Sequence, residues 1–372
     1  MSQDALSETY FDTASGAPLH PAALDVFERA AVAGFADPRR LHDPARRARM
    51  LLDNARASVA DTLNLHPSEV TFVPSGTHAC HLGLLGLIPR HQPHARLALS
   101  SVEHSAVLQA GQWHEQRGGS VDLMPVDSTG RIQLDALPQD ASVIGVQSAN
   151  HEVGTRQPLA DLRARTDAAL FVDACASGGR DPLPADWDAM ALSAHKWGGP
   201  AGIGILLVRR GAAWWNPFPG DDRPDERSVG FENAAGALAA AAALRAMVDD
   251  ASVHEAHRRM TQRIRAAVQA LPDVEVWGAD EDRLPHIVTF SCLYLDGESL
   301  VTELNKHGFC VASGSACTAS TLEPSHVLAA MGALTHGNVR VSLDRTTTDA
   351  DVDRFLATLP GIVAGLRAEA GV

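Results

Sequence analysis

Short apolar segments alternate with segments of helical period along residues 70–210, and this alternation constrains the fold more than any other feature of the chain. Helical period is found at residues 78–88 and 104–116. The segments that read as buried strands are TFVPS (71–75), RLALS (96–100), SVDLMPV (120–126), ASVIGVQS (141–148), ALFVDA (169–174), DAMALSA (188–194) and GIGILLVRR (202–210). Strands that alternate with helices favour an α/β fold, in which helices cover both faces of a mostly parallel sheet.

The character of the sequence changes after residue 215. Residues 216–233, NPFPGDDRPDERSVGFEN, are rich in proline, glycine and charge, which predicts a surface loop. Beyond it we expect helices at 234–248, 252–271, 297–307, 325–332 and 349–369, and strands at 274–278, 286–292, 309–313 and 338–343. A chain of 372 residues accommodates two domains. We therefore expect a large α/β domain over 15–255 and a smaller C-terminal α+β domain over 256–372, with residues 1–14 packed on either.

Charge and composition exclude several protein classes. The net charge of −14 argues against a nucleic-acid-binding protein, which needs a basic surface. No run approaches the ~20 apolar residues of a membrane span, and the first residues lack the pattern of a secretory signal, so we expect a cytoplasmic protein. The five cysteines are odd in number and form no C-x-x-C pair, which argues against a disulfide framework and a structural zinc site.

A lysine and an aspartate each stand at the end of a predicted buried strand. Lys196 follows the strand that ends near Ser193, where desolvation would lower the pKa of the amine and suit it to Schiff-base chemistry. Asp173 ends another apolar strand, and a buried carboxylate needs a cationic partner such as the ring nitrogen of pyridoxal phosphate. Taken singly, Lys196 also fits a side chain that extends to solvent, and Asp173 fits a turn cap.

Small residues lie where the first predicted strand turns into a helix. Ser75, Gly76 and Thr77 would leave N–H groups free at a helix N-terminus, which favours a phosphate group. Simple capping of the helix by Ser75 is the alternative. The next residues, HACH (78–81), do not have a standard metal-ligand spacing, so no metal site is expected there.

A histidine and an arginine complete the set of candidate polar residues. His104 follows the strand at 96–100, where an imidazole could stack on an aromatic ring and transfer protons. Arg340 lies within the apolar strand 338–343, where its guanidinium would bind a carboxylate in a bidentate manner. A structural ion pair is the alternative for Arg340, and His104 is one of 17 histidines.

Cys317 lies in unusual surroundings for a cysteine. It is flanked by small residues in SGSACTAS (313–320), after the apolar segment FCVA (309–312). Most thiols in such a chain are small buried hydrophobic residues, whereas this thiol lies in a tract with the composition of a flexible loop.

The order of these features resembles that of a known enzyme family. A phosphate turn, His104, Asp173, SAHK (193–196) and a late arginine resemble the fold-type I pyridoxal-phosphate enzymes of the class V aminotransferase group. Within that group the chain is similar to the cysteine desulfurases. The segments that carry this similarity are GESLVTELNKHGFCVASGSACTASTLEPSHVLAAMG (297–332) and VRVSLDRTTT (339–348), and the resemblance extends from YFDTASGAPLHP (10–21) to the last helix.

The resemblance implies a reaction and a cofactor. Pyridoxal 5'-phosphate would be held by Lys196, with Asp173 at the ring nitrogen and His104 stacked on the ring. L-cysteine would bind through its carboxylate to Arg340. Its sulfur would pass to Cys317 as a persulfide while L-alanine leaves, and the small residues would let the loop move.

The resemblance also implies further contacts and partners. Thr77, Ser193 and His195 match the family's phosphate contacts. A sulfur-acceptor protein or thiolation enzyme would take the persulfide by thiol exchange, and family members form homodimers.

Four places depart from the family pattern, and the first is the phosphate turn, which reads Thr77-His78-Ala79 where Thr-Glu or similar is usual. Ala176 stands where a glutamine bonds the cofactor's phenolic oxygen, His151 stands where an asparagine is common, and Phe231 stands where a threonine reaches the neighbouring subunit. Each lost neutral hydrogen bond is worth roughly 0.5–1.5 kcal/mol. An atypical member that donates sulfur to one pathway is the hypothesis these changes suggest.

Two other classes of function compete with this one. A selenocysteine lyase, a C–S lyase or an aminotransferase of the same fold would use Lys196 but would not need Cys317. A non-catalytic scaffold of the same fold would need neither residue.

Overall fold

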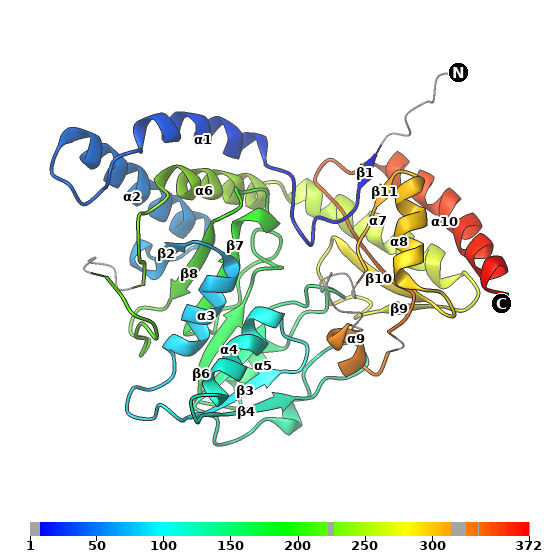
Figure 1. Ribbon diagram of the computed structural model, residues 1–372, viewed down its shortest axis with the longest axis horizontal. Coiled ribbons are helices and arrows are strands. Elements are labelled where there is room, and N and C mark those ends of the chain that lie inside the picture. Colours follow the sequence, from blue (N-terminus) through cyan, green and yellow to red (C-terminus); the bar gives the residue numbers. More distant parts are fainter. Residues whose placement is uncertain (1–7, 222–226, 314–324, 334, 372) are drawn as a thin grey trace.

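The computed structural model describes residues 8–221, 227–313, 325–333 and 335–371. Its largest sheet has seven strands in the order β2-β8-β7-β6-β5-β3-β4 (Figure 1). These strands are β2 (Val70–Val73), β3 (Arg96–Ser100), β4 (Ser120–Met124), β5 (Val143–Gln147), β6 (Ala169–Asp173), β7 (Ala189–Ser193) and β8 (Gly204–Val208). Strands β4, β3, β5, β6 and β7 are parallel, and β8 is antiparallel to both of its neighbours. The mostly parallel α/β sheet expected from the sequence is confirmed.

Helices cover both faces of this sheet because successive side chains of each strand point to opposite faces. In β6, Leu170 and Val172 join the core on one face, whereas Phe171 joins the core on the other. Helices α3 (Gly76–Gly86) and α4 (Ser105–Glu115) pack on the Phe171 side, and α6 (Ala234–Asp249) packs on the opposite side.

Two helices near the N-terminus were not anticipated from the sequence. Helix α1 (Pro21–Ala33) and helix α2 (Asp43–Leu63) both pack against α6. Each begins with a proline in its first turn after a histidine that accepts a backbone hydrogen bond as the N-cap, a signal that favours helix initiation. A short helix, α5 (Leu159–Arg163), lies between β5 and β6 in the sequence.

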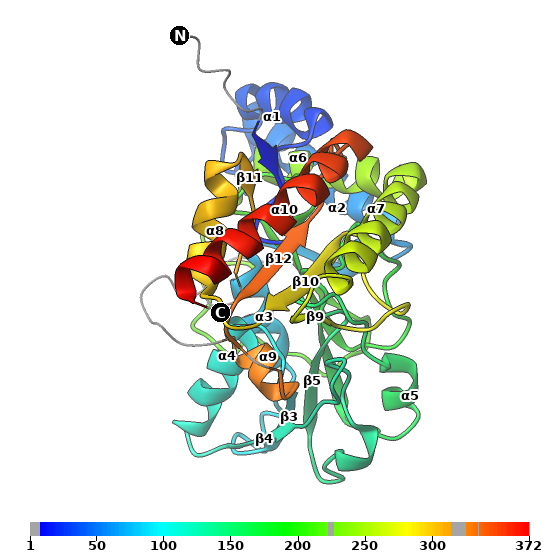
Figure 2. The same ribbon diagram turned by 90° about the vertical axis from the view of Figure 1, so that its right-hand side faces the viewer.

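A second, antiparallel sheet has the order β12-β10-β9. Its strands are β9 (Val274–Trp277), β10 (Ile287–Cys292) and β12 (Asn338–Ser342). Its core includes side chains from α7 (Ala251–Gln269), α8 (Gly297–Lys306) and α10 (Asp349–Ala370), and Figure 2 shows α7 and α10 lying beside this sheet. The boundary expected at residue 255 falls inside α7, and the division of the chain into two domains stays a prediction.

The N-terminal segment connects the two sheets. Strand β1 (Thr9–Tyr10) pairs in parallel with β11 (Phe309–Cys310), and Phe11 is buried in the core of the second sheet. A few residues later, the Ala17 N–H donates to the His195 carbonyl oxygen over 2.8 Å, beside the end of β7. The segment therefore runs from the second sheet to the carboxyl edge of the first.

The helices within the described ranges include none that is both long and apolar enough to cross a membrane.

Candidate active site

A cavity of about 270 Å³ opens at the carboxyl ends of β5, β6 and β7. Because parallel strands end at the same edge of a sheet, residues far apart in sequence meet there. The cavity is lined by every residue that the sequence suggested for cofactor binding, namely Thr77, His104, His151, Asp173, Ser193, His195 and Lys196. Two predicted residues are not among its lining. Arg340 instead donates a hydrogen bond to Ser15, which does not line the cavity, and Cys317 falls outside the described residues.

Lys196 is held at the cavity by the N-terminal segment. It ends the short 3-10 helix η3 (Ala194–Lys196), which directly follows β7. Its Nζ donates hydrogen bonds to the carbonyl oxygens of Ala14 and Ser15, the latter over 3.1 Å. The turn after it needs glycine: Gly198 has a φ of +82°, and a Cβ there would lie 3.0 Å from the Pro18 carbonyl oxygen. The amine of this cavity-lining residue is thus held against the backbone of the N-terminal segment.

Asp173 is the last residue of β6 and is 6% exposed. Its Oδ1 accepts a hydrogen bond from the Cys175 N–H over 2.9 Å. Among the described residues, no lysine, arginine or histidine forms an ion pair with this carboxylate. A buried carboxylate without a cationic partner is costly, so this position favours a positively charged group in the cavity.

The N-terminus of α3 faces the same cavity. Ser75 caps the helix, because its Oγ accepts a hydrogen bond from the His78 N–H over 3.0 Å. A Cβ at Gly76 would come within 2.7 Å of the Ser193 Cβ, so only glycine lets the helix start this close to β7. Ser193 Oγ lies 3.1 Å from His195 Nδ1. Helix N–H groups and hydroxyls converge here, which suits an anionic group such as phosphate.

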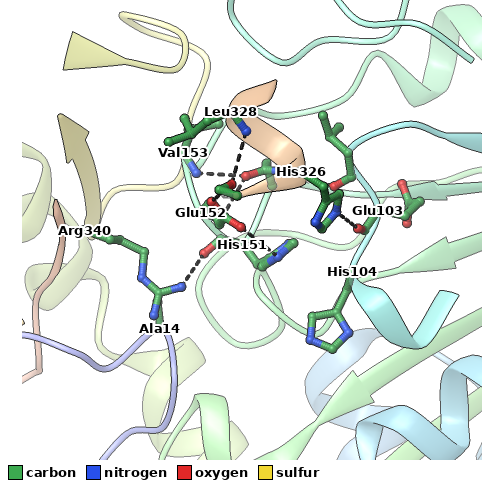
Figure 3. Close-up of polar contacts among 12 residues, drawn as sticks. Ala14, Glu103, His104, His151, Glu152, Val153, His326, Leu328 and Arg340 are labelled. Carbon is green, nitrogen blue, oxygen red and sulfur yellow. Dashed lines mark hydrogen bonds and ion pairs between the residues drawn. The ribbon is translucent and has the colours of Figure 1, made fainter. Parts of the chain in front are cut away.

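Two histidine rings stand together on another side of the cavity. His104 Nδ1 accepts a hydrogen bond from the Ala106 N–H over 3.1 Å, so Nε2 is the ring atom that carries the proton in the neutral form. The rings of His104 and His151 meet edge to face with centroids 5.2 Å apart (Figure 3). Burial lowers the pKa of His104 and lowers that of His151 further, which keeps both rings neutral at pH 7.

A buried carboxylate network behind these rings was missed by the sequence analysis. Ser325 Oγ donates to Glu152 Oε2 over 2.6 Å, and His326 Nε2 donates to the Glu103 carbonyl oxygen over 2.8 Å. Ser325 also caps helix α9 (His326–Ala330) by accepting from the Leu328 N–H. Figure 3 shows these contacts beside His151. The sequence offered one signal for this network, namely the acidic residue Glu152 directly after His151 in SANHEVG (148–154).

Arg340 lies in β12, and its side chain is 5% exposed. Its Nη2 donates to Asp12 Oδ1 over 2.8 Å and to Ser15 Oγ over 2.7 Å, and its Nη1 donates to the His151 carbonyl oxygen over 3.1 Å. Asp12 and Ser15 are contacts that the sequence analysis did not foresee. Both basic side chains therefore contact Ser15: Arg340 binds its hydroxyl, and Lys196 binds its backbone carbonyl oxygen.

The chain is similar to known proteins along nearly its whole length. The family model described as aminotransferase class-V matches residues 9–355. The chain is 34% identical over 352 residues to cysteine desulfurase 2 of Trichormus variabilis, with 90% of this chain and 87% of the relative covered. It is also 34% identical to an IscS-like cysteine desulfurase of Mycobacterium tuberculosis, with 96% and 97% covered. A solved structure of a NifS-like protein superimposes with a TM-score of 0.88 at 25% identity, covering 96% of this chain and all of that one.

Proposed function

This chain belongs to the class-V aminotransferase family and, within it, to the cysteine desulfurases, and from this membership we propose how its residues carry out the reaction. The proposed reaction removes the sulfur of L-cysteine, releases L-alanine and leaves a persulfide on Cys317. The observation that carries the proposal is the single cavity that gathers Lys196, Asp173 and His104.

The residues of this cavity fit pyridoxal phosphate, on which enzymes of this family generally depend. The N-terminus of α3 with Ser193 offers donors for a phosphate, and Asp173 is a buried carboxylate without a cation among the described residues. Thr77 and His195 would complete the phosphate contacts, and Lys196 would bond the carbonyl carbon of the cofactor. When bound, the cofactor supplies a protonated ring that accepts electrons from the substrate.

The chain's own groups then divide the work of positioning and proton transfer. Lys196 Nζ would act as the base, since Lys196 lines the cavity and two backbone carbonyls fix the position of its amine. His104 would donate or accept through Nε2, because its Nδ1 is engaged with a backbone N–H. Arg340 would bind the carboxylate of L-cysteine in exchange for its contact with Asp12.

Cys317 is the proposed sulfur acceptor. Its thiolate would form a bond to the sulfur of L-cysteine as the C–S bond of the substrate breaks. The two thiols that line the cavity, Cys80 and Cys175, are poor nucleophiles, because the pKa of each is raised. The hydrogen bond with Cys80 lowers the pKa of Cys175, but burial and the charge of Asp173 together outweigh it and raise this pKa to about 11.

The proposal also includes two partners, a sulfur acceptor and a second copy of this chain. The persulfide would pass to a sulfur-acceptor protein by thiol exchange in the cytoplasm, and two copies of the chain would form the working unit. Phe231, at the family's inter-subunit threonine position, is 61% exposed and thus available for contact with a second copy.

Mass spectrometry after brief exposure to L-cysteine and a thiol-blocking quench tests the reaction. We expect one added sulfur on the Cys317 peptide, and none in Lys196→Ala. Alanine or pyruvate that accumulates while Cys317 stays unmodified, or activity that survives Cys317→Ala, would instead support the lyase alternative.

A further inference from the structure

Two thiols and a carboxylate form a compact group on the wall of the cavity. The Sγ atoms of Cys80 and Cys175 and a carboxylate oxygen of Asp173 all lie within 4.8 Å of one another. Cys80 is 1% exposed in α3, and Cys175 follows β6 by two residues. All three residues line the cavity that contains Lys196.

The charge around this group is unbalanced. Asp173 lacks an ion pair within the described ranges, and Glu103 nearby is fully buried with an Oε2 that has no hydrogen-bond partner there. The amine of Lys196 is directed toward the carbonyls of Ala14 and Ser15. A cation bound beside Asp173 would stabilise its buried carboxylate, because an opposite charge nearby favours the ionised form.

The ligand chemistry indicates which cation would bind. Two sulfur ligands with one carboxylate suit thiophilic d10 ions such as Zn²⁺ and Cd²⁺, which accept mixed sulfur and oxygen ligands in tetrahedral geometry. Three protein ligands leave a fourth position for water from the cavity. Hard cations such as Mg²⁺ prefer oxygen ligands and would not select two thiols.

We propose that Cys80, Cys175 and Asp173 bind a thiophilic divalent cation in the cofactor-free protein, and that this cation and pyridoxal phosphate exclude each other. Both occupants need the Asp173 carboxylate, so both cannot be bound at once. As each metal–sulfur bond forms, the thiol releases its proton to solvent. The HACH segment therefore contributes its cysteine alone, since neither His78 nor His81 belongs to the group.

Titration of the cofactor-free full-length chain with Cd²⁺ tests the proposal. The loop thiol is removed by Cys317→Ser, and the sulfur-to-cadmium charge-transfer band and equilibrium dialysis report binding. We expect one Cd²⁺ per chain. Affinity should fall about tenfold or more in Cys80→Ser and in Cys175→Ser, since even the loss of a supporting group around a metal costs about that much.

Two controls make the result specific. Cys292→Ser removes a thiol buried in the core of the second sheet and should leave Cd²⁺ binding unchanged. Circular dichroism checks that each variant is folded. Where a Cys→Ser variant is not folded, the Cys→Ala variant at the same position takes its place. Unchanged binding in both cavity variants, or no binding at all, would overturn the site.

Addition of pyridoxal phosphate tests the exclusion. Loading the protein with the cofactor should remove the Cd²⁺ band, and Cd²⁺ should weaken cofactor binding to the same extent. Simultaneous binding of both would overturn the exclusion. A protein that binds Cd²⁺ at this site but never binds the cofactor would refute the proposed function while supporting the metal site.

Discussion

At the scale of single residues, two positions of the cavity lack the amides that the resemblance places there. Ala176 lines the cavity where the resemblance places a glutamine, and His151 stands where it places an asparagine. His151 is a buried neutral imidazole whose backbone carbonyl is held by Arg340. The chain therefore has one polar side chain where the resemblance places two.

Restoring the amide should strengthen cofactor binding. In Ala176→Gln, a new hydrogen bond worth about 0.5–1.5 kcal/mol would tighten pyridoxal phosphate by roughly twofold to tenfold. Fluorescence titration of the cofactor-free protein measures the affinity. Ala176→Leu is the matched control, since it adds similar volume without a donor. Equal affinities in Ala176→Gln and the parent chain would contradict the expectation.

Arg340 should act on substrate binding more than on the later steps. Arg340→Gln removes charge-assisted hydrogen bonds worth about 1.5–3 kcal/mol, so KM for L-cysteine should rise about 10-fold to 100-fold with a smaller change in kcat. Steady-state alanine formation gives both constants.

A second arginine controls for loss of a buried charge. Arg265→Gln breaks an ion pair with Asp280, and since neither residue lines the cavity it should leave KM unchanged. A fall in kcat at constant KM in Arg340→Gln would contradict the carboxylate-binding role.

At the scale of elements, helix α9 begins directly after the segment that carries Cys317 and contacts the site through its N-cap, Ser325. The Oγ of Ser325 donates a hydrogen bond to Glu152 Oε2 over 2.6 Å, beside His151. On the other side, Ala312 exchanges backbone hydrogen bonds with Arg340. The described residues on each side of this segment, Ala312 and Ser325, thus contact residues of the site.

Ser325→Ala should weaken this attachment. It removes a helix cap worth about 1 kcal/mol and the partner of a buried carboxylate, so persulfide formation on Cys317 should slow several-fold while cofactor affinity is unchanged. Quench-flow mass spectrometry gives the rate. Thr348→Ala, which removes the cap of α10, is the matched control. Similar slowing in both variants would show a general loss of stability instead.

At the scale of the whole molecule, buried neutral histidines make stability depend on pH. Burial lowers the pKa of His257 to about 4, and that of His286 lies well below its usual value for the same reason. An unfolded histidine binds its proton near pH 6.5, before the folded one does. The stabilising contribution is therefore present above pH 6.5 and is lost as the pH falls toward 4.

Urea unfolding at pH 7 and pH 5 measures this effect. The shift of His257 alone corresponds to about 3 kcal/mol across its full range, of which a part is lost by pH 5. His257→Gln should flatten the dependence, because glutamine does not titrate. His91→Gln, at an exposed position, should leave it unchanged. A parent chain that is equally stable at both pH values would refute this account.

Local patterns were sufficient to predict most of the elements and the order of the site residues. Apolar runs such as residues 169–173 identified the strands of the main sheet, and Lys196, Asp173 and His104 were identified because they follow such strands. Helices α1 and α2 escaped notice because their surfaces are mixed in polarity and their partner, α6, is distant in sequence.

Only the tertiary structure decided which distant residues touch. The contact of Arg340 with Asp12 spans 328 positions and that of Ser325 with Glu152 spans 173, and no local pattern encodes such pairs. The same holds for the group of Cys80, Cys175 and Asp173, which exists because α3 begins against the end of β7. The sequence by itself determined which chemical groups are available at the strand ends. The packing of helices and strands determined their distances, and distance decides which groups can bind the same ligand.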